Sequence, residues 1–214
     1  MPRFDLEKWF WAHETYGVTD VAMVPPVSSS RISRPGWRTC VLIIPYQITI
    51  MAINSPLKDK YNLKAAKLGS VGAAPLDKHP QARMQALLGG KPVTQVWGMT
   101  ETSCIATRFV YPSYDTTGSV GVPVPNLDVK LVDDDGRDIT GFDVRGELCV
   151  RGPTVIRGYF ENPEANKRDF DEDGYFHTGD IAYVARTSGL YYIVDRKKVS
   201  ACCGVAVLPK DALT

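Results

Sequence analysis

The chain has 214 residues, enough to bury one good hydrophobic core or two small ones. Its 25 Lys and Arg residues almost balance its 24 Asp and Glu residues, which gives a formal net charge of +1. Since no basic run is longer than the one from Arg196 to Lys198, the charge offers no basis for a nucleic-acid partner.

The five cysteines are odd in number and show no Cys-x-x-Cys or Cys/His ligand spacing. This pattern predicts reduced thiols and no zinc site. The amino terminus is too polar for a signal peptide. The most apolar run, 41–53, contains Pro45 and Gln47 and is well short of the roughly 20 residues of a membrane helix. We therefore expect a cytoplasmic protein without a transmembrane segment.

Residues 4–97 alternate predicted helices and strands. Asp5 is placed to cap the first helix, and Gly89 and Gly90 end a later one. Such alternation predicts an α/β layer in which the loops at the strand ends are available to a ligand. The helices are expected over 4–14 and 76–88, and the strands over 18–24, 65–71 and 93–97.

From Gly118 the pattern changes to short β segments separated by turn signals rich in Gly, Asp and Pro. One helix is expected over 162–170, with Asn162 as its N-cap and Pro163 at its first position. A second, mostly β lobe follows from this pattern. Its strands are expected over 129–132, 147–151 and 191–194.

Three short motifs carry the chemistry: Trp-Gly-Met-Thr-Glu at 97–101, Tyr-Phe-His-Thr-Gly-Asp at 175–180, and Val-Asp-Arg-Lys-Lys at 194–198. In this order and spacing the chain resembles the adenylate-forming acyl-CoA ligases, a superfamily that includes 4-coumarate–CoA ligases, fatty acyl-CoA synthetases and beetle luciferases. The resemblance implies part of the large N-terminal domain of these enzymes. Residues 1–117 would form a partial α/β AMP-binding subdomain, and 118–198 a mostly β, distorted barrel-like subdomain ending at a hinge.

The resemblance also implies an ATP-dependent ligase that joins a carboxylic acid to AMP and then to coenzyme A, with Mg²⁺ as metal. Thr100 and Glu101 take the catalytic places: Thr100 contacts the α-phosphate and Glu101 helps to hold Mg²⁺, for which carboxylate oxygen is a suitable ligand. Asp180 accepts the ribose hydroxyls, Arg196 makes a second ribose or phosphate contact, and Lys198 is the hinge. The other nucleotide-binding positions are Gly72, Ala73, Ala74, Gln95, Val96, Trp97, Gly98 and Met99.

Val96, Cys104 and Ile105 match positions that line the acyl pocket of 4-coumarate–CoA ligases. Val96 replaces a common glycine, so a bulkier floor favours another aryl acid or a medium-chain acid over a hydroxycinnamate. His177 is expected to be structural, and Glu147 and Arg151 are expected to form an internal ion pair.

Two segments match nothing in the family. Residues 27–47 interrupt the resemblance before an apolar helix that resumes near Ile48, and 199–214 replace the continuation expected after Lys198. Both begin Val-Ser, which an in-frame splice-donor sequence encodes, and the first ends at Gln47, whose codon can end in a splice-acceptor AG. The hypothesis is two retained introns; the alternative is a genuine insertion and a divergent tail.

The family's Ser/Thr/Gly-Lys phosphate loop and its C-terminal lid domain have no counterpart here. We therefore expect an acyl-CoA ligase fragment with the AMP side of its site, inactive by itself. The alternatives are a non-catalytic protein that binds AMP or acyl-AMP and a mis-annotated gene product. A full-length relative could be peroxisomal, and the sequence leaves the acid, the oligomeric state and the acceptor thiol open.

Overall fold

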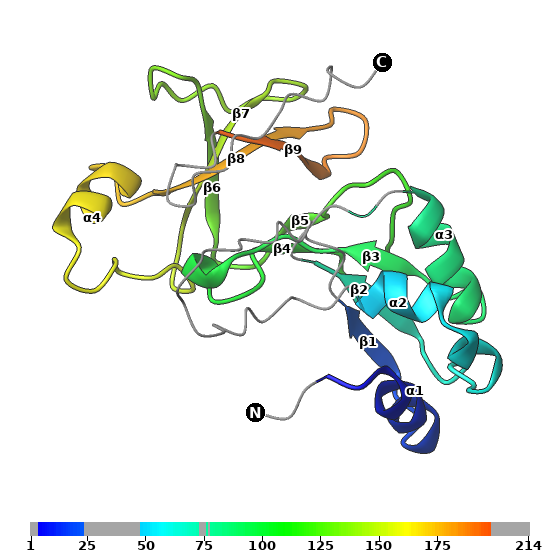
Figure 1. The fold of residues 1–214 in the computed structure, drawn as a ribbon. Coiled ribbons are helices and arrows are strands. Elements are labelled where there is room, and N and C mark those ends of the chain that lie inside the picture. Colours follow the sequence, from blue (N-terminus) through cyan, green and yellow to red (C-terminus); the bar gives the residue numbers. More distant parts are fainter. Residues whose placement is uncertain (1–3, 24–47, 73–75, 77, 198–214) are drawn as a thin grey trace, which may run out of the picture. The chain divides into compact units, whose positions relative to one another are not determined.

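The computed structural model describes residues 4–23, 48–72, 76 and 78–197 (Figure 1). The predicted insertion at 27–47 and the tail at 199–214 lie outside them. The chain divides into two compact units, Met1–Pro125 and Asn126–Thr214, each considered by itself. This division falls after the expected boundary at 117/118. The reason is that β5 (Val122–Pro123) pairs with β4 (Thr107–Arg108), which ties 118–125 to the first unit.

The first unit is built on a parallel sheet of three strands in the order β1-β2-β3. The strands are β1 (Asp20–Met23), β2 (Leu68–Val71) and β3 (Val93–Gln95). The predicted α/β layer is thereby confirmed. Because parallel strands end at the same edge of a sheet, Gly72 after β2 and Val96 after β3 leave the sheet side by side, where the predicted ligand-binding segments begin.

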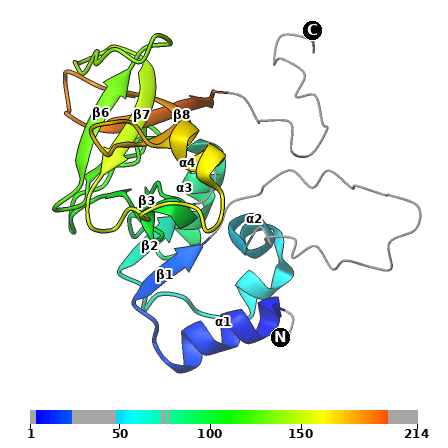
Figure 2. The same cartoon turned by 90° about the vertical axis from the view of Figure 1, so that its left-hand side faces the viewer.

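The helices of this unit are α1 (Leu6–Thr15), α2 (Ile48–Asn54) and α3 (Lys78–Leu87), with the short 3₁₀ turn η1 (Pro56–Asp59) after α2 (Figure 2). Helix α2 contacts both α1 and α3. Both predicted helix ends are confirmed: the Asp5 carboxylate accepts from Lys8 N at 3.0 Å, and Gly90 N donates to the Gln85 carbonyl at 2.8 Å. The helices and strands enclose one apolar core, in which Phe10, Met84, Leu88 and Val93 are fully buried.

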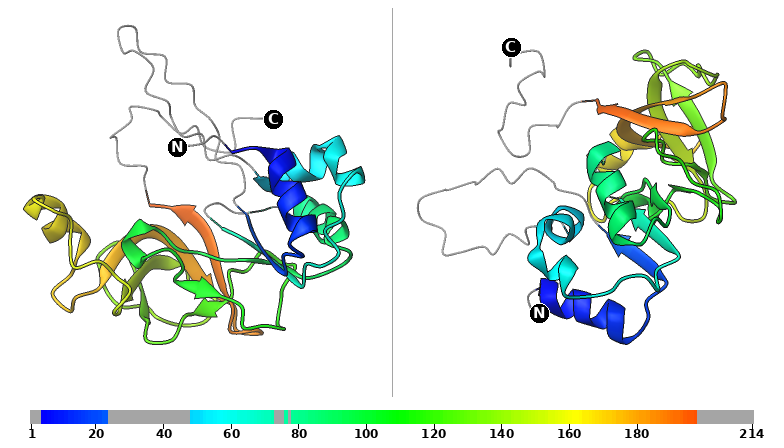
Figure 3. Two further views of the ribbon diagram at one scale, coloured as in Figure 1. Left: turned by 90° about the horizontal axis from the view of Figure 1, so that it is seen from below. Right: turned by 90° about the vertical axis from the view of Figure 1, so that its right-hand side faces the viewer.

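The second unit is an antiparallel sheet in the order β6-β7-β8-β9, and Figure 3 shows its strands from two further sides. The strands are β6 (Asp128–Val132), β7 (Gly146–Arg151), β8 (Phe176–Val184) and β9 (Tyr191–Arg196), and α4 (Pro163–Asp169) precedes β8. The Asn162 side chain caps α4 by accepting from Ala165 N at 3.1 Å, as predicted. The mostly β lobe is confirmed, but the described strands form an open sheet and no closed barrel.

The described helices include none that is both long and apolar enough to cross a membrane.

Candidate functional site

A sharp turn after β3 carries the Trp-Gly-Met-Thr-Glu motif. Trp97 leaves the strand and forms an antiparallel bridge with Thr107, whose N–H donates to the Trp97 carbonyl at 3.0 Å. The indole packs into the protein and only 8% of Trp97 is exposed. The predicted contact of this ring with adenine therefore stays a prediction.

Residues Thr100–Thr102 then make a single 3₁₀ turn, η2. Buried Thr102 braces it, because its hydroxyl accepts from Met99 N at 3.0 Å. The turn closes when Cys104 N donates to the Met99 carbonyl at 3.1 Å. Thr100 lies exposed on this turn and Glu101 is half-buried. The motif did not point to Thr102, although a Thr side chain commonly bonds to the main chain of a residue three positions earlier.

Gly98 is required by packing. A Cβ atom at this position would lie 1.8 Å from the Cys104 carbonyl oxygen and 2.9 Å from the Ile105 Cα. Ser103 and Cys104 adopt positive φ values of 54° and 97°, which bring the chain back over the glycine. The exposed pair Cys104 and Ile105, two of the predicted acyl-pocket residues, thus leaves the turn directly beside Gly98.

Gly72 and Val96 face each other at the ends of β2 and β3. Val96 N donates to the Val71 carbonyl at 2.9 Å, and a Cβ on Gly72 would lie 2.7 Å from the Val96 Cγ2 atom. Two predicted site residues are therefore in contact. Ala73 and Ala74, predicted next to them, lie outside the described residues.

Gln95 is buried, and its side chain binds main chain. Its amide oxygen accepts from Leu76 N at 3.0 Å, and its amide nitrogen donates to the Leu76 carbonyl at 2.9 Å. The side chain thus anchors the residue that follows the small-residue segment 72–75. Its predicted part in nucleotide binding remains a prediction.

In the second unit, Asp180 and Arg196 form a pair across β8 and β9. They are opposite each other in register, and Arg196 Nε donates to Asp180 Oδ1 at 2.7 Å. Asp180 is 4% exposed, whereas 64% of the Arg196 side chain is exposed. Two residues predicted from separate motifs are therefore brought together. Lys198, the predicted hinge, lies outside the described residues.

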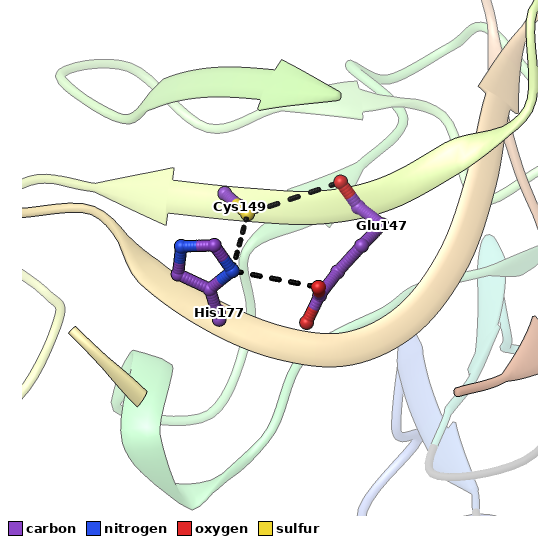
Figure 4. A group of neighbouring side chains, drawn as sticks. All are labelled: Glu147, Cys149 and His177. Carbon is purple, nitrogen blue, oxygen red and sulfur yellow. Dashed lines mark hydrogen bonds and ion pairs between the residues drawn. The ribbon is translucent and has the colours of Figure 1, made fainter. Parts of the chain in front are cut away.

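Beside this pair lies a cluster formed by Glu147 and Cys149 on β7 and His177 on β8 (Figure 4). The His177 Nδ1 atom lies 3.4 Å from both Glu147 Oε2 and Cys149 Sγ. Glu147 also accepts from Gly179 N and from Lys197 Nζ. Arg151 instead pairs with Asp128 at 2.8 Å, so the expected Glu147–Arg151 ion pair is wrong.

These contacts shift the pKa values of the cluster. Burial alone would raise the pKa of Glu147, but the bonds from His177, Gly179 and Lys197 outweigh it and leave that pKa lowered. The bond to Glu147 raises the pKa of His177. Burial raises the pKa of the Cys149 thiol to about 12. At neutral pH the cluster therefore holds a carboxylate and a protonated thiol.

The ligand atoms of Glu147, Cys149 and His177 all lie within 4.8 Å of one another, close enough for one metal ion. However, both Glu147 oxygens already accept hydrogen bonds, and a metal would need the thiolate rather than the thiol. We therefore assign the cluster a structural role. Glu101 is a half-buried carboxylate on the η2 turn, and carboxylate oxygen is a ligand that suits Mg²⁺.

The raised pKa of His177 predicts a pH dependence of stability. A raised pKa means that the native state binds the proton more tightly than the unfolded chain, so the contribution is complete below the ordinary pKa of 6.5 and is lost as pH rises through the native value. The imidazole faces Glu147, Asp171 and Cys149, and Asp171 in turn binds Lys130. We expect the difference in unfolding free energy between the unaltered chain and His177→Gln to be largest at about pH 6 and to shrink as pH rises above the ordinary pKa of 6.5, as measured by urea denaturation. A constant difference across this range would contradict the assignment.

Comparison with known proteins places these features in a family. Residues 1–160 match the AMP-binding enzyme family. The chain is 49% identical over 199 residues to acyl-CoA synthetase ACTT5 of Alternaria alternata, covering 92% of this chain and 31% of that protein. It is 44% identical over 175 residues to phenylacetyl-CoA ligase epaB of Aspergillus niger, covering 81% and 32%.

Among solved structures, ATP-bound MatB of Rhodopseudomonas palustris superposes with a TM-score of 0.71 at 26% identity, covering 92% of this chain and 34% of that one. The chain thus spans about a third of the length of the curated relatives it matches. The resemblance to acyl-CoA ligases that the three motifs suggested is confirmed. The chain belongs to the AMP-binding enzyme family.

Proposed function

We propose that the chain is the AMP-binding part of an ATP-dependent acyl-CoA ligase. Such an enzyme activates a carboxylic acid as its acyl-AMP and then transfers the acyl group to coenzyme A. The observation that carries the proposal is the Asp180–Arg196 pair, in which a buried carboxylate is held at 2.7 Å by an exposed guanidinium. A carboxylate fixed in this way is suited to accept two converging hydroxyl groups of a ribose.

The residues of the first unit would contact the phosphate and the base. The exposed Thr100 hydroxyl would donate to the α-phosphate, and the Glu101 carboxylate would hold Mg²⁺, a hard cation that prefers oxygen ligands. Gly72 and the main chain around Val96 would approach the adenine, since Gly72 has no side chain of its own and a Cβ there would already meet the Val96 Cγ2 atom at 2.7 Å. Mg²⁺ when bound would neutralise phosphate charge.

An aryl or medium-chain acid is the proposed substrate. The Val96 side chain would narrow an acyl pocket at the end of β3, and the exposed Cys104 and Ile105 would add sulfur and aliphatic surface to it beside Gly98. The relative named phenylacetyl-CoA ligase supports an aryl acid. The test is acyl-CoA formation by a whole protein that contains this region. Phenylacetate or octanoate should be converted faster than coumarate.

The 214 residues by themselves are expected to bind AMP but not to form acyl-CoA. They correspond to about a third of the length of their relatives, and charge stabilisation of the transferred phosphoryl group requires several donors acting together. Calorimetric titration of the 214-residue chain should show binding of AMP and much weaker binding of CMP. A pyrophosphate-exchange assay on the same sample should give no signal.

Equal affinity for AMP and CMP, or no affinity for either, would contradict nucleotide binding. Pyrophosphate exchange by the 214 residues would contradict their expected inactivity while supporting the ligase assignment.

A further inference from the structure

We infer that Glu147 is a positioning residue that holds the Asp180–Arg196 pair in place for the ribose of the nucleotide. The inference rests on the proposed function, in which this pair binds the ribose hydroxyls. Glu147 itself would not touch the nucleotide. It acts through the two residues that adjoin the pair in the sequence.

One carboxylate reaches both strands that carry the pair. Glu147 Oε1 accepts from the N–H of Gly179, the residue before Asp180, at 3.0 Å. Glu147 Oε2 accepts from the ammonium of Lys197, the residue after Arg196, at 3.2 Å. A main-chain bond joins the same two neighbours, because Lys197 N donates to the Gly179 carbonyl at 2.6 Å. Glu147, Gly179 and Lys197 are thus bonded to one another directly beside the Asp180–Arg196 bond.

The pairing of β7 with β8 is irregular beside Glu147, which explains why the main-chain N–H of Gly179 needs an acceptor from a side chain. In the pairing of β7 with β8, Glu147 is opposite Ile181 and Cys149 is opposite His177, so Leu148 alone faces 178–180. Such a bulge turns side chains away from their regular direction and interrupts the ladder of main-chain bonds. Gly179 lies in the bulge at a φ of 70°. Its N–H finds its acceptor in the Glu147 carboxylate, which replaces a ladder carbonyl.

The burial of Glu147 strengthens its bonds to Gly179 and Lys197. Its side chain is 9% exposed, so water screens its charge only weakly. Its lowered pKa keeps it ionised at neutral pH, and His177 provides a third contact at 3.4 Å. Loss of this charge would release Lys197 and weaken the bond to Gly179, and Asp180 would then sample other orientations in the bulge.

The test compares two nucleotides that differ only in the ribose hydroxyls, AMP and 2′,3′-dideoxy-AMP, by calorimetric titration of the 214-residue chain. We expect the unaltered chain to prefer AMP by at least about tenfold, since charge-assisted bonds to the hydroxyls are lost in the dideoxy compound. In Glu147→Gln the preference should fall to about threefold or less, with the dideoxy affinity unchanged. A general loosening of the protein would weaken both nucleotides alike.

Asp128→Asn serves as the matched control, because it neutralises a carboxylate in the same sheet that binds only the exposed Arg151 among the described contacts. It should keep the full preference. If Glu147→Gln does not fold, Lys197→Met removes the other end of the bond at a side chain that is 34% exposed, and the preference should fall about twofold to threefold.

A variant of Glu147 or Lys197 that folds and keeps the full preference for AMP would overturn the inference while leaving the proposed function intact. An unaltered chain that binds AMP without any preference over the dideoxy compound would overturn the ribose role of Asp180 and, with it, this inference. No binding of AMP by the unaltered chain would overturn the proposed function itself.

Discussion

Replacing Gly98 by alanine is expected to destabilise the first unit by about 3 kcal/mol or more and to abolish AMP binding. The added methyl group would lie 1.8 Å from the carbonyl oxygen of Cys104 and 2.7 Å from its carbonyl carbon. Both atoms belong to the main chain, so no rotation of a side chain can relieve the overlap. The turn that presents Thr100 and Glu101 would have to open.

The measurement is urea denaturation of the 214-residue chain together with titration by AMP. Gly141→Ala is the control, because a methyl group there would meet its nearest neighbour at 3.6 Å, an ordinary van der Waals contact. The control should unfold within about 1 kcal/mol of the unaltered chain. If Gly98→Ala matched the control in both stability and AMP affinity, the tight approach of Cys104 to Gly98 would be refuted.

The local signals in the sequence predicted the helix ends of both units well. Caps, glycines and hydrophobic spacing act over a few residues, so Asp5, Gly90 and Asn162 could be assigned to helix ends directly. Strand β8 was not predicted, because the motif 175–180 interrupts its apolar alternation with the bulge at Gly179. The short pairing of β4 with β5 was also missed, and with it the extent of the first unit.

The site was predicted as a set of residues, while its internal contacts were not. Glu147 and Arg151 were expected to pair, yet residues four apart on a strand are separated by about 13 Å along its axis. The actual partners of Glu147 are His177 and Gly179 on β8 and Lys197, the residue after β9. Those contacts join residues at least 30 positions apart in the sequence, which periodicity and motif spacing within one chain do not specify.

Replacing Asp180 by asparagine is expected to weaken AMP binding by about 2–3 kcal/mol, on the order of 30- to 150-fold. An amide keeps the volume of the buried side chain but offers one acceptor oxygen and no charge to the ribose hydroxyls. The bond from Arg196 would also weaken. Since the Arg196 side chain is 64% exposed, water can solvate the guanidinium, and the unfolding free energy should fall by less than about 1 kcal/mol.

Affinity and stability should therefore separate in Asp180→Asn, whereas a disrupted fold would lower both. Asp143→Asn, which removes an exposed carboxylate paired with Arg186 in the same unit, should change neither. The affinity for 2′,3′-dideoxy-AMP should also be the same in Asp180→Asn and in the unaltered chain, because that ligand lacks the hydroxyls Asp180 is proposed to bind. If AMP bound Asp180→Asn as tightly as the unaltered chain, the Asp180–Arg196 pair would serve the sheet alone, and the ribose contact would have to be sought on other residues.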